Sequence, residues 1–176
     1  MATVKPFEPE KLILGVIYHD KAVFDEAMRI FCERFGEVED VSEEFSFSRE
    51  YSSYYDGELG GEGMRRIYSF KELVDPSLQV EIKELTNAIE AKFGRRINMD
   101  PGLISHGRLM LPTTKPTGFR IALSNGIYTE PTLFWARGAW HKFPWTYRDY
   151  QSERVQKFLV RVRKKYLKQR KETTTE

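Results

Sequence analysis

The chain is poor in cysteine and has no long hydrophobic run. It has 176 residues and a single cysteine, so no disulfide can form within it. Residues 1–11 lack the apolar run of a signal peptide, and no apolar run approaches the length of a membrane span. These absences predict a cytoplasmic protein that has reduced thiols and no membrane partner. We expect Cys32 to be a small buried hydrophobe rather than a nucleophile.

The chain also lacks a strong excess of charge of either sign. Its 28 basic and 26 acidic residues leave a formal net charge of +2, so attraction for an anion must come from a local cluster. Aromatic residues are abundant at 14%, which predicts a packed core rather than disorder. We expect a single domain over residues 1–176, with an extended lead-in at 1–10 and a frayed tail at 171–176.

Familiar catalytic and nucleotide-binding motifs are missing as well. His19, His106 and His141 are far apart and lack metal-ligand spacing, and no serine, histidine and acid form a recognisable triad. The glycines of residues 57–63 do not have the spacing of a phosphate-binding loop. The sequence therefore leaves cofactor and metal unknown, and it leaves open whether the protein is an enzyme.

Two segments of clear periodicity are present in the first half of the chain. The apolar run at 12–18 predicts a strand covered on both faces. A helix should follow from Asp20, its cap, to Gly36, its stop. Asp75-Pro76 opens the best-defined helix, which Gly94 ends. We interpret the charges on the outer side of this second helix as solvated: Glu81, Lys83, Glu84 and Glu90.

Between these helices the signals are weaker. Residues 39–50 alternate loosely and predict a half-exposed strand, followed by a loop at 51–63 and a short strand at 64–70. After the second helix a strand should begin near Arg95. We expect a turn at Asp100-Pro101-Gly102.

The remaining segments predict an antiparallel meander and a terminal helix. Residues 109–111 form a short apolar strand, Asn125-Gly126 signals a hairpin, and Gly138 marks a second turn. From Tyr150 onward the pattern is helical. The element order predicts an α+β fold with helices packed on one face of a mainly antiparallel sheet, ferredoxin-like in its N-terminal half.

The hairpin gives Glu130 a predicted direction. A two-residue turn pairs Ile121 with Glu130, so the carboxylate should share a face with the apolar residues Phe119, Ile121, Leu123 and Tyr128. An inward carboxylate needs a partner or a raised pKa, which makes Glu130 a candidate acid, base or metal ligand. The alternatives are a bulge at Pro131 that turns Glu130 outward, an open sheet face, or a purely structural ion pair.

Other polar residues of this region can complete a site. Lys115 and Arg120 suit the binding of phosphate or carboxylate, although they also fit an exposed loop. Asn98 and Asp100 either cap a turn or supply oxygens beside Glu130. Tyr128 and Tyr147 are candidates for the wall of a pocket, and Tyr147 is equally a packing residue before the last helix.

The terminal helix carries many basic residues, which is an expected footprint of nucleic-acid binding. It is also what a solvated helix face looks like, and the chain has neither an RNA-recognition aromatic signature nor a helix-turn-helix pattern. The basic residues concerned are Arg154, Lys157, Arg161, Arg163, Lys164, Lys165 and Lys168.

Four motifs occur together in one order: 98–102 (NMDPG), 113–115 (TTK), 126–130 (GIYTE) and 144–147 (PWTY). With these motifs the chain resembles a prokaryotic family catalogued as domain of unknown function 4416, over nearly its whole length. It departs from the family pattern at Pro131, which replaces an aliphatic residue, and at Arg148, which replaces a proline. The resemblance implies no established activity.

These observations favour a protein that binds a small anionic ligand, either a nucleotide or a sugar phosphate. Lys115 and Arg120 would hold the anion, while Glu130 and Asp100 would act as acid, base or cation ligand. Asn98, Tyr128 and Tyr147 would complete the pocket. A nucleic-acid-binding module and a non-catalytic interaction subunit are the alternatives.

Overall fold

The computed structural model describes residues 2–174 and contains one large antiparallel sheet. The strand order is β2-β4-β1-β5-β6-β8-β7, with β3 paired to β4 and β9 paired to β8. All strand pairs are antiparallel. The strands are β1 (Glu10–Tyr18), β2 (Val38–Val41), β3 (Phe45–Ser46), β4 (Met64–Val74), β5 (Ile97–Ile104), β6 (Arg108–Thr113), β7 (Ile121–Ala122), β8 (Tyr128–Ala136) and β9 (Ala139–Lys142).

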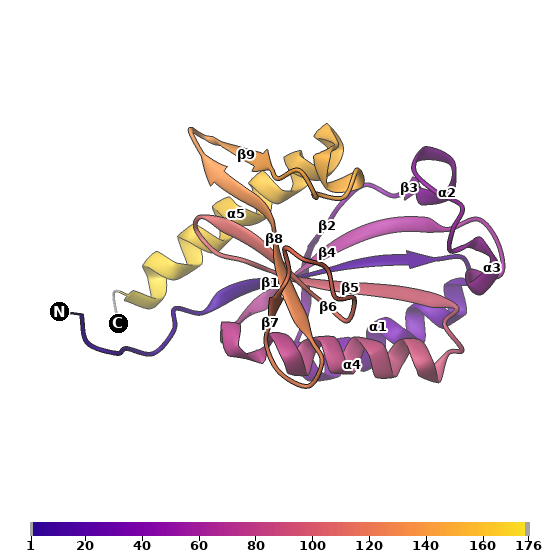
Figure 1. Cartoon of the computed structure of the whole chain (residues 1–176), viewed down its shortest axis with the longest axis horizontal. Helices are drawn as coiled ribbons and strands as arrows, with labels where there is room; N and C mark the ends of the chain where they lie inside the picture. The colour runs from indigo at the N-terminus through magenta and orange to yellow at the C-terminus, as the bar shows by residue number, and fades with distance from the viewer. Residues whose placement is uncertain (1, 175–176) are drawn as a thin grey trace.

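Helices cover both faces of this sheet (Figure 1). The prediction of an α+β fold with a mainly antiparallel sheet is confirmed. We expected the helices to pack on one face of the sheet. Both α1 and α4 do so, whereas α5 covers the opposite face. The helices are α1 (Lys21–Phe35), α2 (Phe47–Glu50), α3 (Asp56–Leu59), α4 (Gln79–Lys92) and α5 (Glu153–Thr174).

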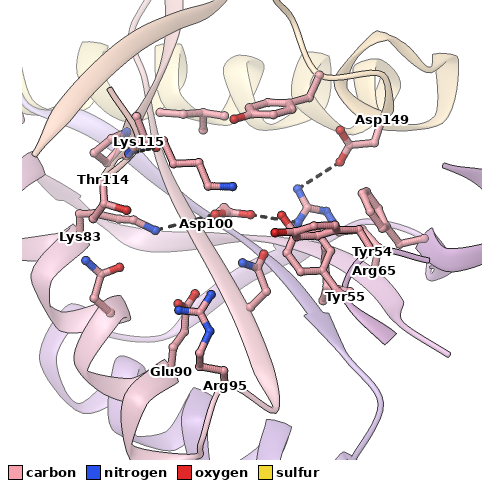
Figure 2. Close-up of a pocket in the computed structure, with 18 of the residues that line it drawn as sticks. Tyr54, Tyr55, Arg65, Lys83, Glu90, Arg95, Asp100, Thr114, Lys115 and Asp149 are labelled. Carbon is pink, nitrogen blue, oxygen red and sulfur yellow. Dashed lines mark hydrogen bonds and ion pairs between the residues drawn. The ribbon is translucent and has the colours of Figure 1, made fainter. Parts of the chain in front are cut away.

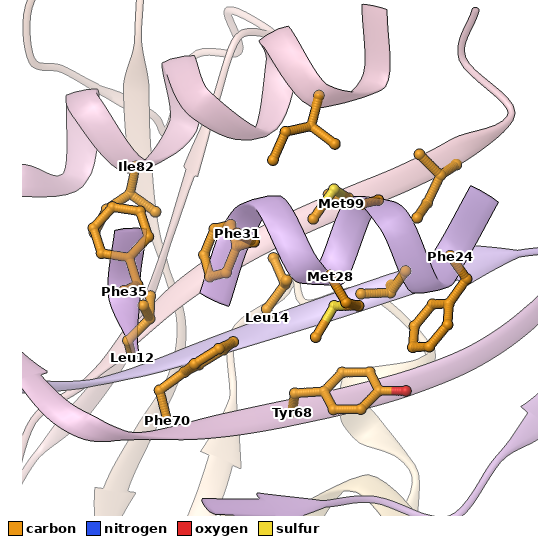
Figure 3. Close-up of a cluster of buried hydrophobic side chains, with 14 of the residues drawn as sticks. Leu12, Leu14, Phe24, Met28, Phe31, Phe35, Tyr68, Phe70, Ile82 and Met99 are labelled. Atoms are coloured by element: carbon orange, nitrogen blue, oxygen red, sulfur yellow. The ribbon is translucent and has the colours of Figure 1, made fainter. Parts of the chain in front are cut away.

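The N-terminal half has the ferredoxin-like arrangement. Its strands follow the order β2-β4-β1-β5, and α1 and α4 pack on the same side. The Asp20 side chain accepts hydrogen bonds from the backbone of Ala22 and Val23, and Gly36 ends α1 with φ 87°. Figure 3 shows the core beneath these helices, where Leu12 and Leu14 of β1 face Phe31 of α1.

The opposite face is built by alternate residues of β1 and by the C-terminal half. Ile13, with no exposed surface, belongs to a second core that includes Phe158, Leu159 and Val162 of α5. Because successive side chains of a strand point to opposite faces, β1 contributes to both cores. The continuous apolar run at 12–18 is thereby explained.

Three segments between the helices differ from the prediction. Residues 39–50 form β2, β3 and the short α2 instead of one strand, and the expected loop at 51–63 contains α3. The strand expected at 64–70 continues to Val74. The tail expected to fray at 171–176 is helical up to Thr174, and residues 175–176 lie outside the described part.

The predicted turn at residues 100–102 is wrong, because β5 passes straight through it. Asp100 lies opposite Gly15 and Pro101 opposite Leu14 of β1. Proline is tolerated there because β6 pairs only with Leu103 and Ile104, so the rest of β5 is an edge strand on that side. Beyond this short pairing β6 pairs with β8, and β5 and β6 separate from each other.

The hairpin at Asn125-Gly126 exists, but its register is shifted by one residue. Ile121 pairs with Thr129, not with Glu130, because Leu123 bonds back to Ile127 directly after the turn. The expected shared face is therefore wrong, and Ile121 is 57% exposed. A second irregularity lies where β6 pairs with Pro131, as expected for a proline inside a sheet.

Candidate functional site

A cavity of about 480 Å³ opens where β5 and β6 separate. Its walls come from the free edge of β5, the end of β6, the inner side of α4, and residues 147–150 before α5. Figure 2 shows Lys83, Lys115, Arg65 and Asp149 around this space, with Asp100 near its centre. The volume falls within the range of small-molecule sites.

Arg65 of β4 is the most deeply buried cation of the cavity, with 3% of its side chain exposed. Its Nη2 lies 3.1 Å from Asp149 Oδ2, and its Nη1 lies 3.5 Å from Asp100 Oδ2. The guanidinium carbon lies 5.9 Å from the ring centre of Phe47 and 5.8 Å from that of Tyr150. Two carboxylates and two aromatic rings therefore fix the guanidinium in place.

Gly15 explains how Arg65 reaches this position. A Cβ on Gly15 would lie 2.8 Å from Arg65 Nη2, which is closer than real Cβ contacts allow. The guanidinium therefore crosses β1 above the glycine and reaches Asp100, which is paired with Gly15 on the next strand. Any larger residue at this position would displace the guanidinium.

Two charged residues of α4 bind the free backbone edge of β5. Lys83 Nζ donates to the carbonyl of Met99 at 3.3 Å, and Glu90 Oε1 accepts from the Met99 N–H at 2.6 Å. Lys83 Nζ also lies 3.8 Å from Asp100 Oδ1. Burial raises the pKa of the Glu90 carboxyl, and Lys83 and the Met99 N–H partly oppose that rise.

Arg120 joins three residues of the cavity wall. Its Nε donates to Glu130 Oε2 at 3.1 Å, its Nη2 to the Tyr147 hydroxyl at 3.0 Å, and its Nη1 to the Lys115 carbonyl at 2.5 Å. Glu130 is 2% exposed, so its burial was predicted correctly although from an incorrect register. Burial raises the pKa of Glu130, and the hydrogen bond from Arg120 opposes this.

Lys115 presents a free cation to the cavity. Figure 2 shows its side chain extending inward beside Thr114. Within residues 2–174, its ammonium takes part in no ion pair. Unlike Arg65 and Lys83, it lies in a loop and keeps all three N–H donors available.

Four buried polar atoms of the cavity residues have no hydrogen-bond partner within the described chain. They are Arg65 Nε, Asn98 Oδ1, Asp149 Oδ2 and the Tyr150 hydroxyl. Asp149 Oδ2 is close to Arg65 but is not aligned for a hydrogen bond. Buried polar groups are nearly always satisfied in native proteins. Five further atoms without a partner lie elsewhere in the described chain, so these four mark a candidate site because they belong to residues that line one cavity.

Five of the residues singled out in the sequence line the cavity: Asn98, Asp100, Lys115, Glu130 and Tyr147. Arg120 lies behind the wall in its ion pair with Glu130. Tyr128 lies on β8 outside the lining.

Sequence reasoning missed Arg65 and Asp149. It also wrongly treated Lys83 and Glu90 as solvated, although Lys83 is only 6% exposed. A signal for this pair was available. The two residues are seven positions apart, and each directly follows a buried apolar residue, Ile82 or Ile89. This spacing places Lys83 and Glu90 beside the buried side of the helix.

The described residues hold no cluster of three or more His, Cys, Asp or Glu side chains suited to a metal ion. None of the helices between residues 2 and 174 combines the length and the apolar character that a membrane crossing needs.

Comparison with known proteins identifies the family. Residues 8–166 match the model of DUF4416, a domain of unknown function. The chain belongs to the DUF4416 family. No curated protein and no solved structure matches it.

Proposed function

We propose that this DUF4416 protein binds a small anionic organic ligand, a nucleotide or a sugar phosphate, in the cavity between β5 and β6. The supporting observation is the pairing of an uncompensated ammonium, Lys115, with a group of buried polar atoms that lack partners. Lys115 and the neighbouring Thr114 are suited to a phosphate, because a lysine supplies donors as a point charge and a hydroxyl adds a further one.

The surrounding residues have distinct roles in this proposal. Arg120 acts as a positioning residue, because it holds the backbone of Lys115 against Glu130. Asp100 lies between Arg65 and Lys83 and accepts hydrogen bonds from the ligand. The assignment of acid–base chemistry to Glu130 and Asp100 stays a prediction, and Glu90 joins them because its buried carboxyl has a raised pKa.

Binding of nucleic acid by α5 has less support. Several of its basic residues are already paired with carboxylates: Arg154 with Glu50, Lys157 with Glu153, and both Arg161 and Lys165 with Asp40. A cation that is already paired adds little attraction for a phosphate backbone. Loss of binding with rising salt, measured on mixed-sequence RNA and DNA, would revive this alternative.

The proposal is tested by thermal shift with a panel of nucleotides and sugar phosphates. We expect a subset to raise the melting temperature of the wild-type protein, as any ligand specific for the folded state must. Lys115→Ala should abolish the shift. Lys164→Ala is the matched control, because Lys164 is exposed on α5 and lies outside the cavity. A shift that Lys115→Ala leaves unchanged would contradict the proposal.

A further inference from the structure

The inner end of the cavity carries donors and acceptors that have no hydrogen-bond partner, although Asp149 Oδ2 is also in the ion pair with Arg65. Arg65 Nε can only donate a hydrogen bond. Asn98 Oδ1 can only accept one, and so can Asp149 Oδ2 while its carboxyl is ionised. The Tyr150 hydroxyl can do both. These side chains are also well enclosed, since Arg65 and Asp149 are each 3% exposed and Tyr150 is 1% exposed. The occupant of this end must therefore offer donors and acceptors within a small space.

Hydroxyl groups match this requirement. Each hydroxyl donates one hydrogen bond and accepts up to two, so neighbouring hydroxyls of a sugar can serve acceptors and donors together. A second phosphate does not match, because the cations at this end, Arg65 and Lys83, are already paired with Asp149 and Asp100. A planar base also carries donors and acceptors on its edge, but it is less suited, because the Phe47 and Tyr150 rings on which it could stack already have the Arg65 guanidinium near them.

We infer that the ligand is a sugar phosphate whose hydroxyls bind Arg65, Asn98, Asp149 and Tyr150, with its phosphate at Lys115. This inference rests on the proposed function and assigns an orientation within the same site. The acidic residues at the inner end and the cation at Lys115 set that orientation. The ligand therefore enters with its sugar first.

Tyr150→Phe is the sharpest variant, because it removes one unpaired oxygen and keeps the ring beside Arg65. Removing a buried hydroxyl that has no partner should leave the stability of the empty protein unchanged or higher. Losing one hydrogen bond to the ligand should weaken binding roughly tenfold. If Tyr150 had only a structural role, the variant would lower both the stability of the empty protein and its affinity for the ligand.

Tyr166→Phe is the matched control. Tyr166 is also 1% exposed, but its hydroxyl donates to the Pro9 carbonyl at 2.9 Å and lies outside the cavity. We expect this variant to lower the melting temperature and to leave binding unchanged. The two tyrosine variants should thus show opposite patterns.

The test uses calorimetric titration with ribose 5-phosphate, 2-deoxyribose 5-phosphate and propyl phosphate. Wild-type protein should bind them in that order of decreasing affinity. Tyr150→Phe should lose affinity for ribose 5-phosphate while its weak binding of propyl phosphate stays the same. Lys115→Ala should lose affinity for all three.

Each result has a defined meaning. Equal affinity for propyl phosphate and ribose 5-phosphate would overturn the sugar assignment and leave the proposed function standing. Unchanged binding by Tyr150→Phe would also overturn it. Failure of wild-type protein to bind any of these ligands, together with no response to nucleotides, would reject both.

Discussion

Two buried cations lie on the same side of the sheet, and their surroundings differ. Lys11, near the start of β1, has no exposed surface. Its Nζ donates to two side chains, Glu39 at 3.1 Å and Gln169 at 2.7 Å, and also lies 2.9 Å from the Phe70 carbonyl and 3.3 Å from that of Lys71.

Arg65 is almost as deeply buried, but its bonding is incomplete. Its Nε has no partner, and the nearby Asp149 Oδ2 is not aligned for a hydrogen bond. Burying a charge is unfavourable unless it is paired and hydrogen-bonded. The chain itself supplies all partners of Lys11, which joins β2, β4 and α5. Beside the cavity, the Arg65 Nε has no hydrogen-bond partner from the described chain, which suits a place where a ligand binds.

The largest expected effect is that of Lys11→Met. This change keeps the length of the side chain but removes the ammonium that donates to Glu39, Gln169 and the Phe70 carbonyl, while the Lys71 carbonyl keeps its hydrogen bond from Gln169 Nε2. Breaking a buried charge pair costs about 3 to 5 kcal/mol, so chemical denaturation should show a loss of this order. Ligand affinity of the folded protein should not change. A loss of less than about 1 kcal/mol would mean that water replaces the ammonium. The surroundings of Lys11 and Arg65 would then not differ as described.

Gly15→Ala should affect the surroundings of Arg65 beside the cavity. The added methyl group displaces the Arg65 guanidinium, and overpacking of this kind costs about 1 to 3 kcal/mol. Binding of ribose 5-phosphate should fall roughly tenfold or more, as measured by calorimetric titration.

Gly57→Ala is the control for this change. Gly57 lies in α3, is exposed, and has open space where a Cβ would be. Alanine there should stabilise the protein by about 0.5 to 1 kcal/mol and leave binding intact. Wild-type affinity in Gly15→Ala would show that the guanidinium position does not matter for the ligand.

The smallest effects are expected from two carboxyls with opposite pH dependence. Arg161 and Lys165 hold the pKa of Asp40 well below its usual range. The resulting stability is present above the unfolded value near 3.8 and is lost as pH falls through the folded pKa. Asp40→Asn should therefore cost about 1 kcal/mol at pH 7, and this gap should close in acid.

Glu90 has a raised pKa, so the sign is reversed. Its ionised form destabilises the folded state above the raised pKa, and the penalty is relieved as pH falls toward the unfolded value of 4.5. Glu90→Gln should be as stable as wild type near pH 4 and more stable, by about 1 kcal/mol or less, at neutral pH. Denaturation midpoints across this pH range test both variants, and parallel profiles would remove the contrast.

Glu130 shows how a correct prediction can rest on an incorrect step. Its burial was inferred from pairing with Ile121, yet the hairpin slips by one residue. Continuing the observed register brings Arg120 opposite Glu130, and this guanidinium is the partner that a buried carboxylate requires. The one-residue shift arises because the N–H of Leu123, not that of Ser124, donates to the Ile127 carbonyl, a choice that the local sequence does not reveal.

The turn predicted at residues 100–102 failed for a related reason. Asp-Pro-Gly is a strong local turn signal, but pairing of β5 with β1 keeps the segment extended. Only the absence of β6 along this part of β5 makes the proline acceptable, and that absence is a feature of the sheet as a whole.

The sequence by itself determined the three long helices α1, α4 and α5, most strands and the α+β class, because caps, periodicity and turn residues act over a few neighbouring positions. The ferredoxin-like half follows from the order of those elements. The sequence indicated five residues of the site, but only tertiary structure brought them together with Arg65 and Asp149. The residues of the site come from segments as distant as Arg65 and Asp149, and they meet where two strands separate. Contacts between such distant residues depend on packing and register, which no local pattern records.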